Sequence, residues 1–243
     1  MTGVYSMAGR TIEISTLHGA VHTMCKAYRA GDDCRPDFSV VTGQKEIDFE
    51  RERSAQLCMA AGEPVPQYSD VYLELTAVCR AVSERMPEYD TFLFHGSAVA
   101  VDGDSYVFTA KSGTGKSTHA RLWRELLGER VVMVNDDKPL IRVTETGALA
   151  CGSPWDGKHH LSNNIAVPIR AVCILERAEE NQIREITREE ALPMMVQQAY
   201  RPFDPVAMAL TMSLIDRMNV KFYRLGCNMD IIAAELSYQT MKG

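Results

Sequence analysis

The chain has 243 residues, of which 46% are hydrophobic and 24% are charged, and its formal net charge is −6. This length predicts one large domain, or one domain with a smaller companion, with enough residues to bury a core. The acidic balance lacks the basic excess that is typical of nucleic-acid-binding proteins, and no apolar run approaches membrane-spanning length. We therefore expect neither nucleic acid nor a membrane as a partner.

The seven cysteines are scattered, with no CxxC pair, and the first residues contain no apolar segment of the signal-peptide kind. These features predict a cytoplasmic protein whose thiols are reduced. We expect all seven side chains to act as small core-filling groups.

Residues 1–90 predict a small α+β region with no chemistry of its own. Strands are expected at 10–15 and 38–42, and helices at 17–29, 47–61 and from residue 69 or 70 to about 86. His18 and His22 have the i,i+4 spacing of a helical metal-binding pair, but no third ligand is evident nearby. A solvated helix face is therefore the favoured interpretation.

Residues 91–243 are expected to form the second, larger domain. Its predicted strands are 91–101, 105–109, 130–134, 140–143, 148–151, 171–175 and 221–225. Its predicted helices are 116–127, 188–200, 205–218 and 230–241. The methionine-rich stripe of helix 205–218 is interpreted as core or subunit packing, which leaves a homo-oligomer open.

The stretch Ala110–Thr118, A-K-S-G-T-G-K-S-T, matches the phosphate-binding P-loop pattern, with alanine where the first glycine usually stands. Glycines in this loop let backbone N–H groups point at phosphate oxygens. Lys116 supplies a charge for the β- and γ-phosphates, and the Ser117 hydroxyl supplies a ligand for Mg²⁺. Because a predicted strand precedes the loop and a predicted helix follows it, a chance glycine turn is disfavoured. The predicted nucleotide-binding residues are Ser112, Gly113, Thr114, Gly115, Lys116, Ser117 and Thr118.

Two further polar stretches are candidates for the same site. Residues 135–137, N-D-D, end a hydrophobic strand soon after the glycine loop, where a Mg²⁺-organising carboxylate is expected; the alternative is a turn with solvated aspartates. Residues 152–164, G-S-P-W-D-G-K-H-H-L-S-N-N, carry aromatic, basic and amide side chains and almost no aliphatic ones. Such a composition is typical of a functional loop, and an ordinary surface loop is the alternative.

The order H-G-S-A-V-A-V-D-G, S-G-T-G-K-S-T, N-D-D resembles the catalytic domain of HPr kinase/phosphorylase, and more distantly ATP-dependent phosphoenolpyruvate carboxykinase. The resemblance covers roughly residues 92–176, and within this group the chain looks most like the bacterial HPr-kinase-like branch. It implies an α/β fold with a P-loop core of the phosphoenolpyruvate carboxykinase kind, preceded by the small α+β region.

The resemblance also implies roles for single residues. Asp136 and Asp137 match the paired aspartates, of which one accepts the proton of the acceptor hydroxyl and the other binds Mg²⁺ together with Ser117. Of the two, we favour Asp136 as the proton acceptor and Asp137 as the metal ligand. His95 matches a histidine close to the acidic pair, which tunes that pair or takes up the proton itself.

The sequence departs from HPr kinase after the acidic pair, where the arginine- and glycine-rich signature of that family is missing. Residues 152–164 occupy this region instead, so the acceptor is not identified and the reverse phosphorolysis is not supported. Within this loop, we expect Lys158 to stabilise charge on the transferring group and Trp155 to form a wall of the acceptor site.

Together these observations predict an ATP- and Mg²⁺-dependent kinase that transfers the γ-phosphoryl group to a hydroxyl acceptor, either a serine of a protein or peptide or a small molecule. Two alternatives stay open: a nucleotide-hydrolysing switch with no acceptor, and a non-catalytic nucleotide-binding module. The intact G-K-S and D-D sequences disfavour the second.

Overall fold

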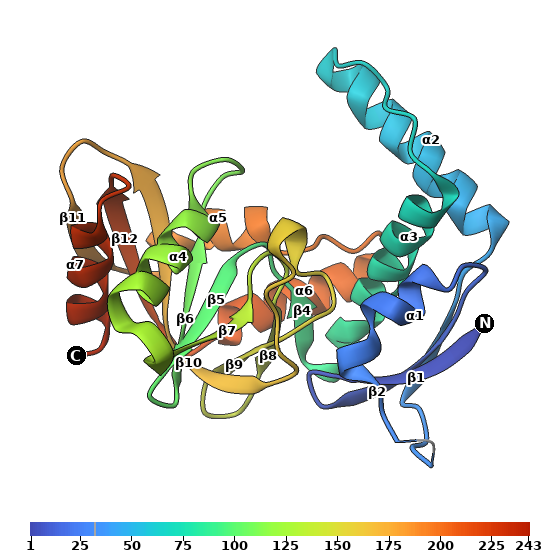
Figure 1. Cartoon of the computed structure of the whole chain (residues 1–243), viewed down its shortest axis with the longest axis horizontal. Coiled ribbons are helices and arrows are strands. Elements are labelled where there is room, and N and C mark those ends of the chain that lie inside the picture. Colours follow the sequence, from blue (N-terminus) through green and yellow to red (C-terminus); the bar gives the residue numbers. More distant parts are fainter. Residues whose placement is uncertain (32) are drawn as a thin grey trace. The chain divides into compact units, whose positions relative to one another are not determined.

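The computed structural model describes residues 1–31 and 33–243, and it shows a mixed α/β chain (Figure 1). The chain divides into two compact units, Met1–Arg85 and Met86–Gly243. Among the described residues, no helix has both the length and the apolar character needed to cross a membrane.

The first unit is built on a three-stranded sheet in the order β1 (Thr2–Met7), β2 (Arg10–Ser15), β3 (Phe38–Val41). Strands β1 and β2 are antiparallel, whereas β2 and β3 are parallel. The sequence analysis did not predict β1, because Gly3 occupies one of its inward positions and weakens the alternation of apolar side chains. The helices of this unit are α1 (Ala20–Met24), α2 (Gln44–Ala61) and α3 (Asp70–Arg85).

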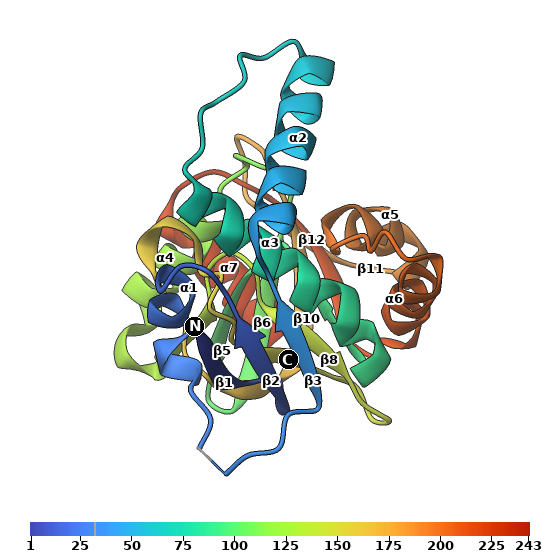
Figure 2. The ribbon, with the colours of Figure 1, turned by 90° about the vertical axis from the view of Figure 1, so that its right-hand side faces the viewer.

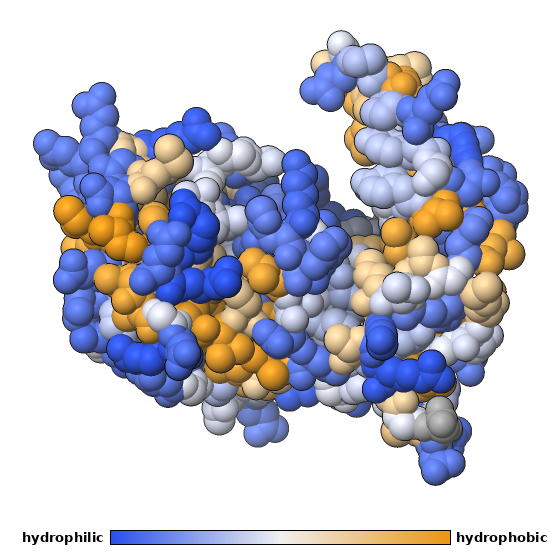
Figure 3. All heavy atoms as spheres, in the orientation of Figure 1, coloured by the Kyte–Doolittle hydropathy of each residue, from blue (hydrophilic) through white to orange (hydrophobic). Residues whose placement is uncertain are grey.

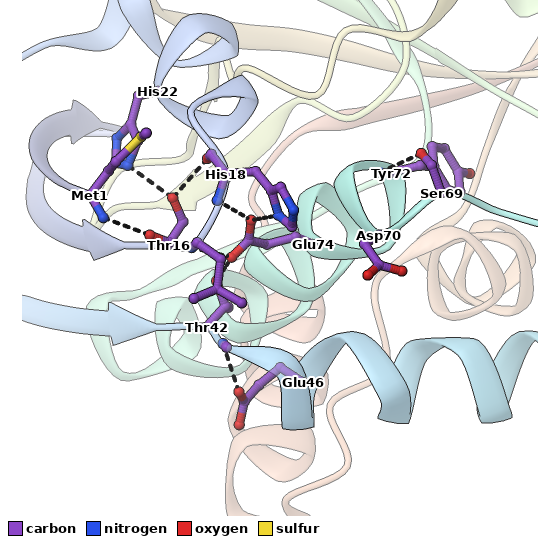
Figure 4. A network of polar contacts seen from close by, with 12 residues as sticks. Met1, Thr16, His18, His22, Thr42, Glu46, Ser69, Asp70, Tyr72 and Glu74 are labelled. Carbon is purple, nitrogen blue, oxygen red and sulfur yellow. Dashed lines mark hydrogen bonds and ion pairs between the residues drawn. The ribbon is translucent and has the colours of Figure 1, made fainter.

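The carboxylate of Glu74 explains why the predicted helix 17–29 is reduced to the short α1 and a 3₁₀ turn. Glu74 is fully buried on α3, and its oxygens accept hydrogen bonds from Leu17 N at 2.7 Å and His18 N at 2.8 Å (Figure 4). They also accept from the Thr42 hydroxyl at 3.0 Å and lie 2.7 Å from His18 Nδ1. The backbone at residues 17 and 18 is therefore held by α3 instead of starting a helix.

His22 belongs to the same polar region, because its ring nitrogens lie 2.7 Å from the Tyr5 hydroxyl and 3.0 Å from the Thr16 hydroxyl. His18 and His22 are both half-buried, so the predicted solvated face is wrong. In residues 1–31 and 33–243, no group of three ligating side chains is placed to hold a metal ion.

The second unit contains a mixed sheet in the order β4 (Thr91–Leu93), β8 (Leu140–Val143), β9 (Ala148–Cys151), β10 (Ala166–Arg177), β6 (Asp104–Thr109), β5 (Ser97–Val101), β7 (Val131–Asn135). Strand β12 (Lys221–Cys227) pairs with the second half of β10, and β11 (Gln182–Ile186) pairs with β12. The long strand β10 is parallel to β6 and β12 but antiparallel to β9. It therefore joins a parallel part of the sheet to an antiparallel part.

Helices cover both faces of this sheet (Figure 2). On β10, Val172 and Ile174 belong to a core that also contains residues of α5 (Arg188–Gln198) and α6 (Pro205–Arg217). The alternate residues Cys173 and Leu175 pack in a second core with α4 (Lys116–Leu127) and α7 (Ile231–Met241). In Figure 3, apolar atoms gather over α7 at the left of the picture, where Ile232 is exposed.

The sequence analysis predicted most elements of this unit and missed two features. The predicted strand 91–101 is two strands, β4 and β5, with a break at residues 94–96. Strand β11 was not predicted because, as an exposed edge strand, it carries charged residues. The cysteines also differ in part from the expectation: Cys151 and Cys173 are buried, whereas Cys34 is exposed.

A substitution at Glu74 tests the account of the first unit. We expect Glu74→Gln to destabilise this unit by roughly 2–4 kcal/mol, because the amide group faces buried N–H donors that the carboxylate now satisfies. Amide hydrogen exchange of β2 and α3 in the full chain measures the change. The matched control is Glu52→Gln on α2, an exposed position where we expect a change within about 0.5 kcal/mol. Equal exchange rates in the two variants would contradict the account.

Candidate functional site

The glycine loop, residues 110–115, lies between the end of β6 and the start of α4. Gly113 has φ = +75° and Gly115 has φ = +121°, conformations that side chains with a Cβ rarely adopt. Gly115 is the N-cap of α4, so the unpaired N–H groups of the first helical turn adjoin the loop. The predicted order of strand, glycine loop and helix is confirmed, and phosphate binding stays a prediction.

Lys116 begins α4, and its side chain folds back into the curve of the glycine loop. Its Nζ donates to the carbonyl of Ala110 at 3.1 Å, and the residue is only 9% exposed. Burial lowers the pKa of Lys116, while the carboxylates of Asp137 and Asp136 oppose this shift. The loop thus holds an ammonium group close to two acidic side chains.

The two aspartates follow β7 directly and have different surroundings. Asp136 is 8% exposed, and its Oδ1 accepts a hydrogen bond from the Ser97 hydroxyl at 2.6 Å. The side chain of Asp137 is more exposed; one oxygen forms an ion pair with Lys138, and the other lies 3.6 Å from His95 Nε2. Ser97 was not among the predicted site residues, although it stands in the H-G-S sequence that contains His95.

His95 lies in the break between β4 and β5. Its backbone N–H donates to Gln198 O at 2.8 Å, and Gly96 N donates to Asp137 O at 3.1 Å. A Cβ at Gly96 would lie 3.0 Å from the carbonyl oxygen of Phe108, so a larger residue would push this turn away from β6. Burial lowers the pKa of His95, the charge of Lys116 lowers it further, and Asp137 opposes both. The imidazole is therefore mainly neutral at pH 7.

Asn135, the last residue of β7, fixes the turn that carries the acidic pair. Its buried side-chain oxygen accepts from the N–H groups of Asp137 at 2.9 Å and Lys138 at 2.7 Å, and its Nδ2 donates to Ser153 O at 3.0 Å. Asparagine often holds a turn in this way. A signal for this role was present in the sequence, because Asn135 immediately precedes the two aspartates.

Residues 152–164 lie against the acidic pair and are not a detached surface loop. Gly157 has φ = +70°, and a Cβ there would lie 3.0 Å from the Cβ of Asp137. Leu161, further along this segment, also contacts the acidic pair: its carbonyl oxygen accepts a hydrogen bond from Asp136 N at 3.0 Å. Trp155 is only 7% exposed, whereas Lys158 is exposed on the 3₁₀ turn Gly157–His159. The expected role of Trp155 as a wall of the acceptor site stays a prediction.

These elements enclose a cavity of about 340 Å³, here called the phosphate cavity. All of its lining residues were predicted from the sequence: His95, Ser112, Gly113, Gly115, Lys116, Ser117, Thr118, Asp136 and Asp137. Two predicted residues do not line it, since Thr114 borders a neighbouring cavity and Lys158 is exposed.

Two further cavities adjoin the phosphate cavity, and Thr118 borders all three. The base cavity, of about 430 Å³, lies between the glycine loop and the ends of β10 and β12, and its apolar lining includes Leu122, Leu175 and Met229. Arg177 borders it and donates to Gly113 O at 2.5 Å. The arginine cavity, of about 210 Å³, lies on the Asp136 side and is described below.

One of the comparisons with known proteins covers this site. A family model described as "SynChlorMet cassette protein ScmC" matches residues 63–230, which include the glycine loop and the acidic pair. A solved structure of the Hpr(Ser) kinase/phosphatase from Coxiella burnetii is a distant structural neighbour, with 9% sequence identity and a TM-score of 0.37. That match covers 62% of this chain and 99% of the other. No curated protein matches the sequence.

The pKa of His95 provides a test of the site's electrostatics. In protein free of nucleotide and Mg²⁺, an NMR titration should give His95 a pKa below its ordinary value of 6.5, with the neutral ring dominant at pH 7. Lys116→Met should raise this pKa because it removes a nearby positive charge, and Asp137→Asn should lower it.

The control for that titration is Lys111→Met, which removes an exposed lysine of the glycine loop and should change the His95 pKa little. His95→Gln identifies the resonance among the six histidines. A pKa at or above 6.5 in the unsubstituted protein would contradict the described environment.

Proposed function

The chain belongs to the family described as SynChlorMet cassette protein ScmC, and we propose that it is an ATP- and Mg²⁺-dependent kinase that transfers the γ-phosphoryl group to a hydroxyl acceptor. The observation that carries this proposal is the phosphate cavity, where a glycine loop, an ammonium group, a serine hydroxyl and two carboxylates meet. Phosphoryl transfer requires charge neutralisation and in-line alignment more than covalent assistance from the protein. These groups are suited to both tasks.

The nucleotide phosphates bind at the glycine loop and the N-terminus of α4. Positive φ angles at Gly113 and Gly115 leave the backbone open on the cavity side, which fits a phosphate group. Lys116 neutralises charge on the β- and γ-phosphates. Ser117 and Asp137 would hold Mg²⁺, which would neutralise charge on the phosphates.

The base and ribose of the nucleotide occupy the base cavity. This cavity shares Gly113, Gly115 and Thr118 with the phosphate cavity but none of the acidic residues. Its apolar side chains suit a planar base, because ligand pockets are lined mainly by apolar groups with a few polar ones. The γ-phosphoryl group then lies toward Asp136, on the side away from the base.

Asp136 is the proton acceptor. Ser97 binds one of its oxygens and leaves the other able to accept a proton, and Asp136 lines both the phosphate cavity and the arginine cavity. As the acceptor oxygen bonds to the γ-phosphorus and the bond to ADP breaks, the hydroxyl proton passes to Asp136. His95 acts on Asp137, because its Nε2 lies 3.6 Å from a carboxylate oxygen of that residue. The exposed position of Lys158, outside the phosphate cavity, gives it no part in this mechanism.

Nucleotide binding is the first test of the proposal. A saturating concentration of Mg²⁺–ATP should raise the melting temperature by roughly 5 °C, because a ligand that binds the folded state alone stabilises it. Lys116→Ala should largely remove this shift, and Lys111→Ala, in the same loop but exposed, should keep it. If the shift survives in Lys116→Ala, the nucleotide binds elsewhere.

The kinase activity is tested by ATP turnover with and without added hydroxyl compounds and serine peptides, with Lys116→Ala as the inactive control. A turnover that rises with an added acceptor supports phosphoryl transfer. A turnover that is independent of every acceptor favours the nucleotide-hydrolysing switch.

The division of labour between the aspartates gives a separate prediction. Asp136→Asn should lower turnover by roughly 10²–10⁴-fold with nucleotide affinity nearly unchanged, because it removes the proton acceptor. Asp137→Asn should instead raise the Mg²⁺ concentration at half-maximal turnover by roughly tenfold or more. Steady-state kinetics over a Mg²⁺ series measures both effects. The same metal defect in both variants would refute the assignment.

A further inference from the structure

The arginine cavity has cationic side chains near the proposed proton acceptor, and the mechanism above does not use them. It is lined by Ser117, Thr118, Ala120, Arg121, Arg124, Met133, Asp136, His159 and Leu161. We propose that this cavity binds the acceptor, and that the acceptor carries a carboxylate or phosphate group close to the hydroxyl that is phosphorylated. This inference rests on the proposed function and specifies the class of its second substrate.

The position of the cavity supports this assignment. It shares Ser117, Thr118 and Asp136 with the phosphate cavity, but it contains no residue of the glycine loop itself. A hydroxyl bound there would lie next to Asp136, in a cavity that shares only Thr118 with the base cavity. In-line transfer requires the acceptor and the leaving ADP to lie on different sides of the γ-phosphoryl group, so separate cavities for the two substrates fit this requirement.

The charges of the lining favour an anionic acceptor. Arg121 and Arg124 are three residues apart on α4, so they lie on one face of the helix, and His159 faces the same space from the 3₁₀ turn Gly157–His159. Arg121 forms an ion pair with Glu125. Among residues 1–31 and 33–243, Arg124 has no ion-pair or side-chain hydrogen-bond partner.

An unpaired guanidinium group binds carboxylates and phosphates well, because its fork of N–H donors matches their oxygens. Asp136 bears the opposite charge and would repel an anion that came close to it. In the proposed complex, the two groups of the acceptor therefore bind to different residues. Arg124 holds the anionic group, and Asp136 faces the neutral hydroxyl. The apolar side chains of Met133 and Leu161 border the space where a short carbon chain joins the two groups.

The size of the cavity restricts the acceptor further. Its volume of about 210 Å³ is below the roughly 300–1,000 Å³ of sites for drug-sized ligands. It therefore suits a hydroxy acid, a small phosphorylated alcohol, or a single serine that carries a nearby anionic group.

The test uses pairs of probes that differ in the anionic group alone. Glycerate and glycerol 3-phosphate are compared with glycerol, and N-acetylserine is compared with N-acetylserinamide. Calorimetry measures their binding to protein saturated with Mg²⁺ and a non-hydrolysable ATP analogue. We expect each anionic probe to bind roughly tenfold to a hundredfold more tightly than its neutral counterpart, as a charge-assisted hydrogen bond allows. The relative affinities of glycerate and glycerol 3-phosphate distinguish a carboxylate from a phosphate acceptor.

Variants then assign the preference to Arg124. Arg124→Gln should reduce the preference to within a few-fold, and Arg124→Lys should keep part of it because it retains the charge without the fork. Arg121→Gln should have a smaller effect, since Arg121 is already paired with Glu125. Arg217→Gln, which removes an arginine that lines a separate cavity, should leave the preference unchanged.

Each outcome decides the inference. Equal binding of anionic and neutral probes, or a preference that Arg124→Gln does not reduce, overturns it while the proposed kinase activity stands. The melting-temperature shift with Mg²⁺–ATP verifies that each variant is folded. If the unsubstituted protein does not bind the nucleotide analogue, the proposed function fails, and the acceptor assignment fails with it.

Discussion

The buried side chain of Asn135 holds together two segments on which the site depends. Its oxygen holds the N–H groups of Asp137 and Lys138, and its nitrogen holds the carbonyl of Ser153. The turn after β7 and the start of segment 152–164 are therefore fixed by one amide group that has no access to solvent. Because an unsatisfied buried polar group is unfavourable, this amide can keep its place only if both segments stay where they are.

The glycine loop and Lys116 are positioned by the packing of α4 against its neighbours. Trp123 on this helix is fully buried, its indole N–H donates to the Ser237 hydroxyl at 2.9 Å, and its ring contacts those of Tyr106 and Tyr238. These contacts fix α4 against β6 and α7. The glycine loop joins β6 to α4, so the place of Lys116 follows from that packing. The functional side chains themselves are held by a few hydrogen bonds, but the rigid elements beneath them are held by a large apolar core.

Where the sequence analysis failed, a contact between distant segments was responsible. The strand predicted over 91–101 is broken because His95 N donates to Gln198 O and Tyr200 N donates to Leu93 O. Gly96 is the one local sign of this break, and the bonding partners lie about 100 residues away in the sequence. The composition of segment 152–164 left an ordinary surface loop open as the alternative, yet the tertiary fold buries Trp155. Ser97 sits in an apolar strand pattern, and only the return of β7 beside β5 brings its hydroxyl to Asp136.

The sequence by itself determined the glycine loop, the helix that follows it and the set of side chains that line the phosphate cavity. These are local features: positive φ angles demand glycine, and a helix N-terminus follows from the residues beside it. Only the tertiary structure decided that Asp136 borders two cavities, that Arg121 is paired whereas Arg124 is available, and that segment 152–164 lies against Asp137. These contacts depend on which surfaces meet when the chain folds. No local sequence pattern indicates which distant residues will come into contact.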